Sequence, residues 1–294
     1  MTLASARSAH RLTAPGHGSH GDPLAAEALG WVLLEGTVVL VLVATAVAYA
    51  LGVHADRCGR GWPVHRTVLW YAGLAAAGTA LVGPLADAAR TSFTAHMVGH
   101  LLLGMLAPLL LVLAAPVTLV LRALPVVGAR RVSRLLGLPV VRVATHPVVT
   151  AVLNGGGLWL LYTTDLYRLM HGSVLLHAAV HLHVLLAGYL FTASMVGLDP
   201  DRHRSSVRLR AAVLVLFVAA HSLLAKWLYI HPPVGVDLGD ARVGAQVMYY
   251  GGDVVDVTLM VLLLAGWYRS TRARVPAGPA PVPARPDPVR PTSG

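Results

Sequence analysis

Apolar residues in this chain form long continuous runs separated by short polar stretches, a pattern typical of helices that cross a lipid bilayer. A helix needs about 20 residues to cross the hydrocarbon core, and seven runs approach or exceed that length. The runs occupy residues 31–53, 67–86, 95–121, 147–164, 173–196, 207–229 and 244–268. The pattern therefore predicts an all-α fold, a polytopic membrane bundle of seven transmembrane helices.

Two of these runs contain residues that interrupt a regular helix. Pro108 and Pro116 lie inside the third run, and a bend is expected there because proline removes a backbone donor and clashes with the preceding turn. The fourth run is the shortest. Asn154, followed by three glycines at 155–157, makes this run more polar and favours a kink.

Arginines are distributed unevenly among the connecting segments. Three or more arginines each occur in the segments 54–66, 122–146 and 197–210 and in the tail from residue 269. The intervening connections hold one each: Arg90, Arg168 and Arg242. Because cytoplasmic loops carry the excess of basic residues, this alternation predicts an N-terminus outside the cell and a C-terminus in the cytoplasm.

The seven runs are expected to form one transmembrane domain, residues 31–270, between two polar tails. Residues 1–30 are predicted to be a flexible extracytoplasmic tail, and residues 271–294, which are rich in proline, a disordered cytoplasmic tail. The first run is too long for a signal peptide and is followed by a basic loop, so we expect it to be a transmembrane helix.

The composition agrees with a membrane protein and argues against other classes. Of the 294 residues, 56% are hydrophobic and 12% are charged, whereas soluble domains carry about 25% charged residues. The net charge of +10 comes from arginine, because Lys226 is the only lysine. No loop is long enough for a concentrated basic patch, so nucleic-acid binding is not expected. The single cysteine, Cys58, excludes an intramolecular disulfide and a thiolate metal site.

Ionisable residues inside the apolar runs are the unusual feature of this sequence. They are His96 and His100 in the third run, His177, His181 and His183 in the fifth, His221 in the sixth, and Asp253 and Asp256 in the seventh. With the predicted orientation and a rise of about 1.5 Å per residue, all of them fall in the outer half of the bilayer.

Helical spacing places some of these side chains on common faces. Residues four apart differ by about 40° around the helix axis, so His96 shares a face with His100, and His177 with His181, while His183 points away. An imidazole in hydrocarbon without a partner costs several kcal/mol, so partners are expected. The sequence therefore predicts a chamber for a metal or heme. A purely structural or proton-relay network of histidines is the alternative.

Several long blocks in this sequence resemble one family. They are HMVGHLLLGMLAPLLLVLAAPVTLVLRALP at 96–125, HPVVTAVLNGGGLWLLYTTDLY at 146–167, HAAVHLHVLLAGYLF at 177–191, GLDP at 197–200, HSLLAKWLY at 221–229 and DxxxGAxxMYYGGD at 240–253. In this order they are similar to the CtaG-like, caa3-type cytochrome c oxidase assembly factors, seven-span proteins of Gram-positive bacteria. The chain departs from the family pattern at Tyr249 and Tyr250, where a tryptophan is expected, and at Asp256, an additional acid.

The resemblance implies a non-enzymatic protein of the bacterial plasma membrane that helps to mature the respiratory oxidase and supplies copper to it. Oxidase subunits and the lipid bilayer would be its partners. Imidazole nitrogen suits copper, and thioether sulfur favours Cu(I). The expected ligands are His96, His100, His177, His181 and His221. Weaker candidates, as ligands or as groups that orient them, are Asp253, Asp256, Met248 and His183.

The same residues are compatible with other functions. The two histidine pairs could instead hold heme b through one histidine from each pair, as in a b-type cytochrome or heme-handling protein. A proton-coupled transporter would use histidine and aspartate as relay groups, but the expected internal repeat is not evident. The aspartates could also pair with Lys226 to hold helices together. A retinal receptor is rejected because Lys226, the only lysine, is not in the seventh run.

Overall fold

The computed structural model describes residues 23–56, 61–197 and 205–272, and every regular element within these ranges is a helix. The first half contains α1 (Pro23–Ala55), α2 (Val64–Leu81), α3 (Pro84–Ala88), α4 (Phe93–Leu101), η2 (Leu102–Leu106), α5 (Ala107–Leu113), α6 (Pro116–Ala123), α7 (Val126–Leu136) and α8 (Pro139–Ala144). The second half contains α9 (Pro147–Ala151), η3 (Val152–Gly156), α10 (Gly157–Thr163), α11 (Leu166–His171), α12 (Val174–Val196), α13 (Val207–Ile230) and α14 (Leu238–Arg272). The predicted all-α fold is confirmed for the described residues.

Six helical segments of the described chain are long and apolar enough to cross a membrane, judged by length and composition. They are Ala28–Ala55, Val64–Ala88, Phe93–Ala123, Val174–Val196, Val207–Ile230 and Leu238–Thr271. The remaining predicted span, 147–164, is helical from Pro147 to Thr163 but is divided into α9, η3 and α10, each of which is short. Its interruption coincides with Asn154 and the glycines that follow, where the sequence favours a kink.

Two predicted boundaries were wrong. Helix α1 begins at Pro23 rather than at Trp31, so part of the predicted N-terminal tail is helical. Helix α14 begins at Leu238 rather than at Gly244, because the polar start LGDAR continues the helix outside the apolar run. The rest of the two predicted tails, residues 1–22 and 273–294, lies outside the described residues.

The third predicted span is the central helix of the bundle and is irregular in two places. In its most apolar stretch of 18 residues, 61% of the residues are buried, whereas only 6% are buried in the corresponding stretch of α1. It passes from α4 through the π-helical segment η2 into α5, which begins just before Pro108. It breaks again at Ala115, whose φ of 51° is left-handed, immediately before Pro116 begins α6. The helix is therefore interrupted before Pro116, and next to Pro108 it contains a π-helical segment.

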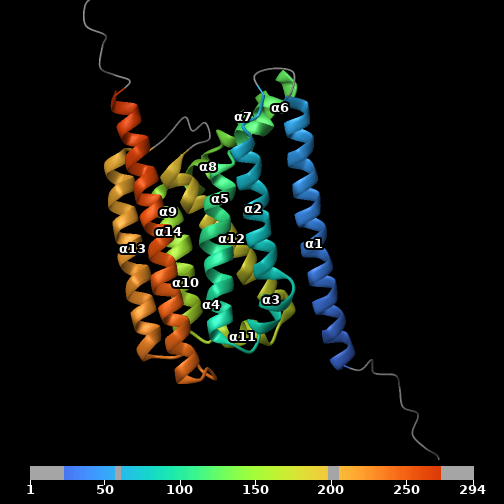
Figure 1. Ribbon diagram of the computed structural model, residues 1–294, viewed down its shortest axis with the longest axis vertical. Coiled ribbons are helices and arrows are strands. Elements are labelled where there is room, and N and C mark those ends of the chain that lie inside the picture. The colour runs from blue at the N-terminus through green and yellow to red at the C-terminus, as the bar shows by residue number, and fades with distance from the viewer. Residues whose placement is uncertain (1–22, 57–60, 198–204, 273–294) are drawn as a thin grey trace, which may run out of the picture.

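Figure 1 shows how the helices surround this central segment. Helix α4 packs against α14, which packs against α13, while α5 and η2 lie between α2 and α12. Helix α1 runs along the periphery. Elements α3 and α11 lie at one end of the bundle, hereafter the α11 end, and α6, α7 and α8 lie at the opposite end.

The peripheral helix α1 is attached by polar contacts along its length. Arg122 of α6 donates two hydrogen bonds of 2.8 Å to the carboxylate of Asp56, which follows α1. Near the same end, the Trp62 indole donates to the Tyr49 hydroxyl at 2.9 Å. Toward the α11 end, Arg90 forms an ion pair with Glu35 at 2.9 Å. These contacts hold a helix that buries little apolar surface.

Small residues allow the inner helices to approach closely. A Cβ atom on Gly188 of α12 would overlap the carbonyl oxygen of Gly104 in η2. A Cβ atom on Gly251 of α14 would overlap Leu101 at the end of α4. Packing of backbones through glycine is typical of membrane helix bundles. It brings α12 and α14 close to the central helix that carries His96 and His100.

Candidate metal centre

The start of α4 is held by a carboxylate from a distant helix. Asp240 of α14 accepts hydrogen bonds from the backbone amides of Phe93 at 2.6 Å and Thr94 at 3.0 Å, and from the Thr94 hydroxyl at 2.6 Å. Ser92 caps the same helix by accepting from the Ala95 amide at 3.3 Å. A carboxylate and a serine at a helix N-terminus accept hydrogen bonds from its free amides, and the negative charge of the carboxylate interacts favourably with the helix dipole. They fix the turn that carries His96.

Four histidines gather at the α11 end, and we refer to His96, His171, His177 and His181 as the four-histidine cluster. The His96 ring centroid lies 6.1 Å from that of His171 and 6.4 Å from that of His181. His181 stacks on His177 with a centroid distance of 4.1 Å. His96 is 6% exposed, whereas the other three are partly exposed. The cluster therefore extends from the buried interior toward the surface.

Two tyrosines line the buried side of this cluster. The Tyr162 hydroxyl is hydrogen-bonded to His96 Nε2 at 3.0 Å, and the Tyr167 ring lies edge-on to His96 with centroids 5.1 Å apart. Burial, and secondarily the carboxylate of Asp240, raises the pKa of the Tyr167 hydroxyl. This group consequently stays protonated at neutral pH and adds no negative charge to the cluster.

Backbone hydrogen bonds set the tautomers of two of these histidines. His181 Nδ1 lies 2.9 Å from the carbonyl oxygen of His177, and His171 Nδ1 lies 2.8 Å from that of Tyr167. A carbonyl oxygen only accepts, so Nδ1 carries the proton in both rings and Nε2 of the neutral ring keeps its lone pair. This arrangement, with Nδ1–H on a backbone carbonyl, is common among metal-binding histidines.

A small cavity lies where three of the predicted ligands face one another. Its volume is about 20 Å³, and its walls include His96, His100, His181 and Tyr162. A void of about 10–15 Å³ already holds one water molecule, so this cavity has room for a small ion. A porphyrin needs a pocket of about 300 Å³ or more. This cavity is therefore the size of an ion and too small for heme, whereas a neighbouring cavity of about 320 Å³, lined by His177 and His181, reaches that size.

A second group lies one turn deeper, and we refer to His100, His221 and Asp256 as the His–Asp cluster. The rings of His100 and His221 are 6.4 Å apart, and His221 Nδ1 lies 3.9 Å from Asp256 Oδ2. All three residues are at most 7% exposed. Gly252 of α14 makes room for the ring, since a Cβ atom there would lie 2.5 Å from His221 Cε1.

Several polar atoms in the two clusters are buried and have no hydrogen-bond partner among the described residues. They are His100 Nε2, His177 Nδ1, both ring nitrogens of His221 and both carboxylate oxygens of Asp256. Buried polar groups are almost always satisfied, so atoms left without a partner suggest a missing ion or water. Neutral imidazole nitrogens fit copper, and the donor set fits a copper ion as cargo.

The described side chains do not form a closed coordination sphere. No three His, Cys, Asp or Glu side chains within the described ranges converge closely enough to hold a metal ion. With a metal–nitrogen bond of about 2 Å, two imidazoles on opposite sides of one ion have ring centroids about 6 Å apart. The spacings of 6.1–6.4 Å are of this size. Rotation of side chains would be needed to direct a third nitrogen at the same point.

The weaker candidates divide into two groups. Asp256 joins the His–Asp cluster, while Asp253, on the same helix, is only half-buried. Met248 is completely buried in the apolar core of α4, α13 and α14, and His183 lies on an exposed face of α12. His183 Nε2 donates to the carbonyl oxygen of Leu153 in η3 at 3.1 Å. This bond satisfies a carbonyl in the π-helical segment and explains His183 without a ligand.

Sequence reasoning missed His171 and Tyr167. Both belong to the short helix α11, which lies in the connection between the fourth and fifth predicted spans. The sequence YRLMH shows that the two residues are four positions apart. On a helix this spacing allows the His171 ring to form its hydrogen bond with the Tyr167 carbonyl. Nothing in the sequence indicated that α11 folds back onto His96.

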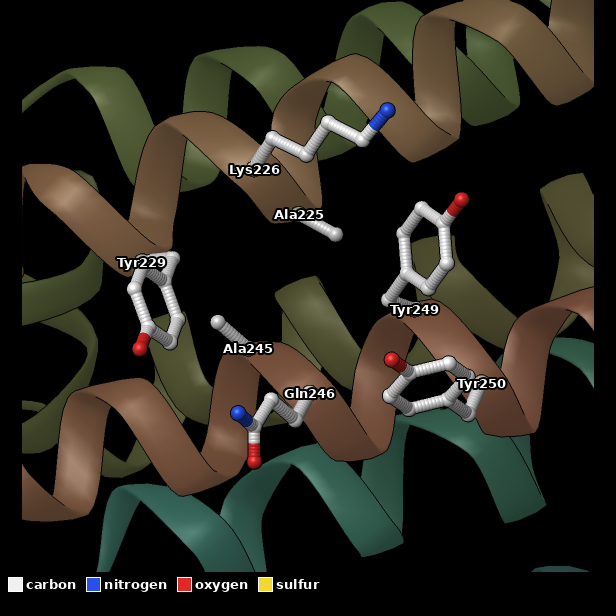
Figure 2. A pocket seen from close by; sticks show the side chains of 7 residues that line it. All are labelled: Ala225, Lys226, Tyr229, Ala245, Gln246, Tyr249 and Tyr250. Carbon is white, nitrogen blue, oxygen red and sulfur yellow. The ribbon is translucent and has the colours of Figure 1, made fainter.

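Lys226 does not pair with the aspartates. Its ammonium lies 5.4 Å from the centroid of the Tyr249 ring, and none of the ion pairs among the described residues includes it. Figure 2 shows it beside an open groove between α13 and α14, and no histidine lines this groove. The alternative in which Lys226 holds helices together through Asp253 or Asp256 is not seen.

The amino-acid sequence is similar to one known protein family and to several mycobacterial proteins. Residues 47–270 match the sequence profile of the family described as cytochrome c oxidase caa3 assembly factor. An uncharacterized protein of Mycobacterium leprae is 28% identical over 263 residues, which is 80% of this chain and 39% of that protein. Uncharacterized proteins of Mycobacterium bovis and Mycobacterium tuberculosis are each 29% identical over 252 residues, 78% of this chain and 38% of theirs. The chain thus spans less than two fifths of these relatives. No solved structure matches it significantly.

Proposed function

Because the chain belongs to the family of cytochrome c oxidase caa3 assembly factors, we propose that it assists assembly of the oxidase by holding copper and passing it on. In this proposal the protein is a multi-pass protein of the bacterial plasma membrane and catalyses no reaction. The helical segment from Pro147 to Thr163 completes seven spans, with the N-terminus outside and the C-terminus in the cytoplasm.

The observation that supports copper best is the small cavity walled by His96, His100 and His181. These side chains come from α4 and α12, and the cavity is the size of an ion. His177 and His221 lie next to its walls, each with a buried nitrogen that has no partner among the described residues. The site is proposed to take copper, because neutral imidazole suits this metal, and to take it as Cu(I), because uncharged ligands in an apolar interior favour the ion of lower charge.

In this proposal the protein residues bind and release the ion without any covalent step. His96, His100 and His181 would hold Cu(I), and His221 would take it in turn with Asp256 beside it. A site with few fixed donors releases its ion by ligand exchange, since an incoming donor can replace one imidazole at a time. The α11 end would face the compartment from which the oxidase is loaded.

The test is an anaerobic Cu(I) titration of purified protein in detergent against a chromogenic chelator. His100→Ala and His181→Ala should each weaken binding by about 100-fold or more, since even outer-shell partners of metal ligands contribute 10- to 100-fold. His183→Ala is the matched control, because His183 lies on the same helix as His181 and is bound to Leu153 instead.

Wild-type protein that fails to compete for about one Cu(I), or binding that survives both cluster substitutions, would overturn the copper proposal. The same preparation supplemented with heme b tests the alternative. A Soret band that disappears in His100→Ala and His181→Ala, but not in His183→Ala, would establish heme as the ligand.

A further inference from the structure

The route by which an ion reaches the buried cavity is a separate question from the site itself. His96 and His100 are 6% and 7% exposed, so neither meets an ion from solution directly. His171 is partly exposed and belongs to α11, which lies outside the six candidate spans. Its ring centroid is 6.1 Å from that of His96. It is thus the histidine of the cluster closest to the end of the bundle.

Resting on the proposed function, we infer that His171 is the entry ligand, which takes copper at the α11 end and transfers it to His96. Its Nδ1–H is bound to the Tyr167 carbonyl at 2.8 Å, so Nε2 is left as the donor. The Tyr167 ring contacts both histidines, with centroids 4.7 Å from His171 and 5.1 Å from His96. This contact keeps the two imidazoles at a separation that one ion can bridge.

A similar spacing recurs among the histidine pairs of the two clusters. His171 to His96, His96 to His181, and His100 to His221 are separated by 6.1, 6.4 and 6.4 Å between ring centroids. Since an ion between two imidazoles needs about 6 Å, each of these pairs could exchange one nitrogen for the next. The small cavity, which His96, His100 and His181 all line, would connect the two clusters. Transfer ends at the His–Asp cluster, where the carboxylate of Asp256 balances the positive charge.

A residue that carries the ion only in transit changes the forward and reverse rates equally and leaves the equilibrium unchanged. His171→Ala should therefore slow Cu(I) loading by about tenfold in stopped-flow mixing, while the dissociation constant from chelator competition stays that of the wild type. His231→Ala is the control, because His231 Nδ1 also donates to the carbonyl four residues earlier, at 3.2 Å, but lies outside the cluster.

Each outcome decides the inference. Loading at the wild-type rate, or equal slowing in His231→Ala, overturns the entry role while the copper site stands. A dissociation constant that weakens together with the rate shows that His171 is a permanent ligand, which also overturns it. Wild-type protein without copper binding overturns the proposed function and this inference together.

A different observation carries a second proposal, independent of copper. The groove in Figure 2 has a volume of about 310 Å³ and lies between Lys226 and Tyr229 of α13 and Gln246, Tyr249 and Tyr250 of α14. No carboxylate lines it, and Lys226 has no ion pair within the described ranges. Arg242 lies over the Tyr229 ring at 5.4 Å and adds a second cation near the groove.

We propose that this groove binds an anionic phospholipid through its phosphate. Lys226 would bind the phosphate, and the Tyr249 hydroxyl, which Figure 2 shows at the same end of the groove as the ammonium, would donate to it. The exposed apolar residues Leu223 and Val254 offer contacts for an acyl chain along the two helices. A lysine in an apolar helix can extend its ammonium to the interface, where a lipid phosphate is the anion that the bilayer supplies.

The test is thermal unfolding in detergent with added phosphatidylglycerol, phosphatidylcholine or soluble glycerol phosphate. Phosphatidylglycerol should raise the midpoint for the wild type by a few degrees. Lys226→Met should lose at least half of the shift, and Lys226→Arg should retain it. Arg168→Met, on exposed α11, is the control and should respond like the wild type. Equal shifts from phosphatidylcholine or glycerol phosphate, or a full shift in Lys226→Met, would overturn the proposal.

Discussion

At the scale of single residues, the space around His221 depends on a missing side chain. Gly252 faces the imidazole so closely that a Cβ atom would lie 2.5 Å from Cε1 and 3.0 Å from Nδ1. Gly252→Ala should displace the ring and weaken Cu(I) binding by about tenfold, although every proposed donor is retained. Chelator competition measures this effect. Gly156→Ala, whose nearest neighbour would be 3.9 Å away, should bind as the wild type; equal binding in both variants would remove His221 from the site.

Another residue-scale prediction concerns the contact between α12 and the central helix. A methyl group on Gly188 would overlap the Gly104 carbonyl, and backbone cannot rotate away as a side chain can. Gly188→Ala should lower the free energy of unfolding by about 1–3 kcal/mol or prevent folding. Gly36→Ala, with nothing within 4 Å of the added atom, should be neutral or slightly stabilising. Thermal unfolding in detergent compares them, and equal midpoints would contradict the packing argument.

At the scale of elements, the position of α4 depends on Asp240 of α14. Its carboxylate accepts from the amides of Phe93 and Thr94 and from the Thr94 hydroxyl, so its loss leaves two amides of the first turn unsatisfied. Asp240→Ala should lower stability by about 1–2 kcal/mol and loosen the turn that carries His96.

The measurements for Asp240→Ala are the thermal midpoint and the Cu(I) affinity, both of which should fall. Asp165→Ala is the control, because Asp165 stands at the N-terminus of α11 without forming a side-chain cap. Equal effects in the two variants would show that the contact between α14 and α4 does not position the helix.

The two π-helical segments are features at the scale of elements: η2 follows the histidine-bearing helix α4, and η3 includes the start of the glycine-rich stretch. Segment η2 begins directly after His100 and Leu101, and η3 contains Asn154. Such segments are frequent at functional sites because they leave backbone groups without their usual partners and rotate the residues that follow. The carbonyl of Leu153 finds its partner in His183. Proline and glycine in the sequence indicated that these helices would be irregular, but they did not indicate that the irregular segments would be π-helical.

At the scale of the whole molecule, the two ends of the bundle differ in chemistry. The four-histidine cluster lies at the α11 end, while α6, α7 and α8, with most arginines of the segment 122–146, lie at the opposite end. Because basic residues favour the cytoplasmic side, the α11 end should face outward. The single cysteine, Cys58, belongs to an arginine-rich connection and provides a direct test.

A membrane-impermeant maleimide should label Cys58 only after cells are permeabilised. In a Cys58→Ser background, Asp165→Cys at the exposed N-terminus of α11 should be labelled in intact cells. The cysteine-free Cys58→Ser protein is the background control. Labelling of Cys58 in intact cells, with protection of the cysteine at 165, would reverse the orientation and with it the side from which copper is taken.

The amino-acid sequence by itself determined the helical class, the approximate limits of most long helices and the irregular helical segments near Pro108, Pro116 and Asn154. These properties follow from local composition, because apolar length, proline and glycine act within a few residues. The pairing of His96 with His100 and of His177 with His181 on common faces was also local. The starts of α1 and α14 were not, because both helices extend beyond their apolar runs; in α14 the extension carries Asp240, which binds the start of α4.

Only the tertiary structure decided which of these residues meet. It brought His171 to His96 through the fold of α11, chose Asp256 over Asp253 as the carboxylate beside His221, and turned His183 to a backbone carbonyl. It also separated Lys226 from both aspartates. These contacts depend on how neighbouring helices are rotated and how deeply they lie relative to one another. Glycine contacts and the Asp240 cap fix that arrangement. They join segments far apart in the chain, so the periodicity of the sequence does not predict them.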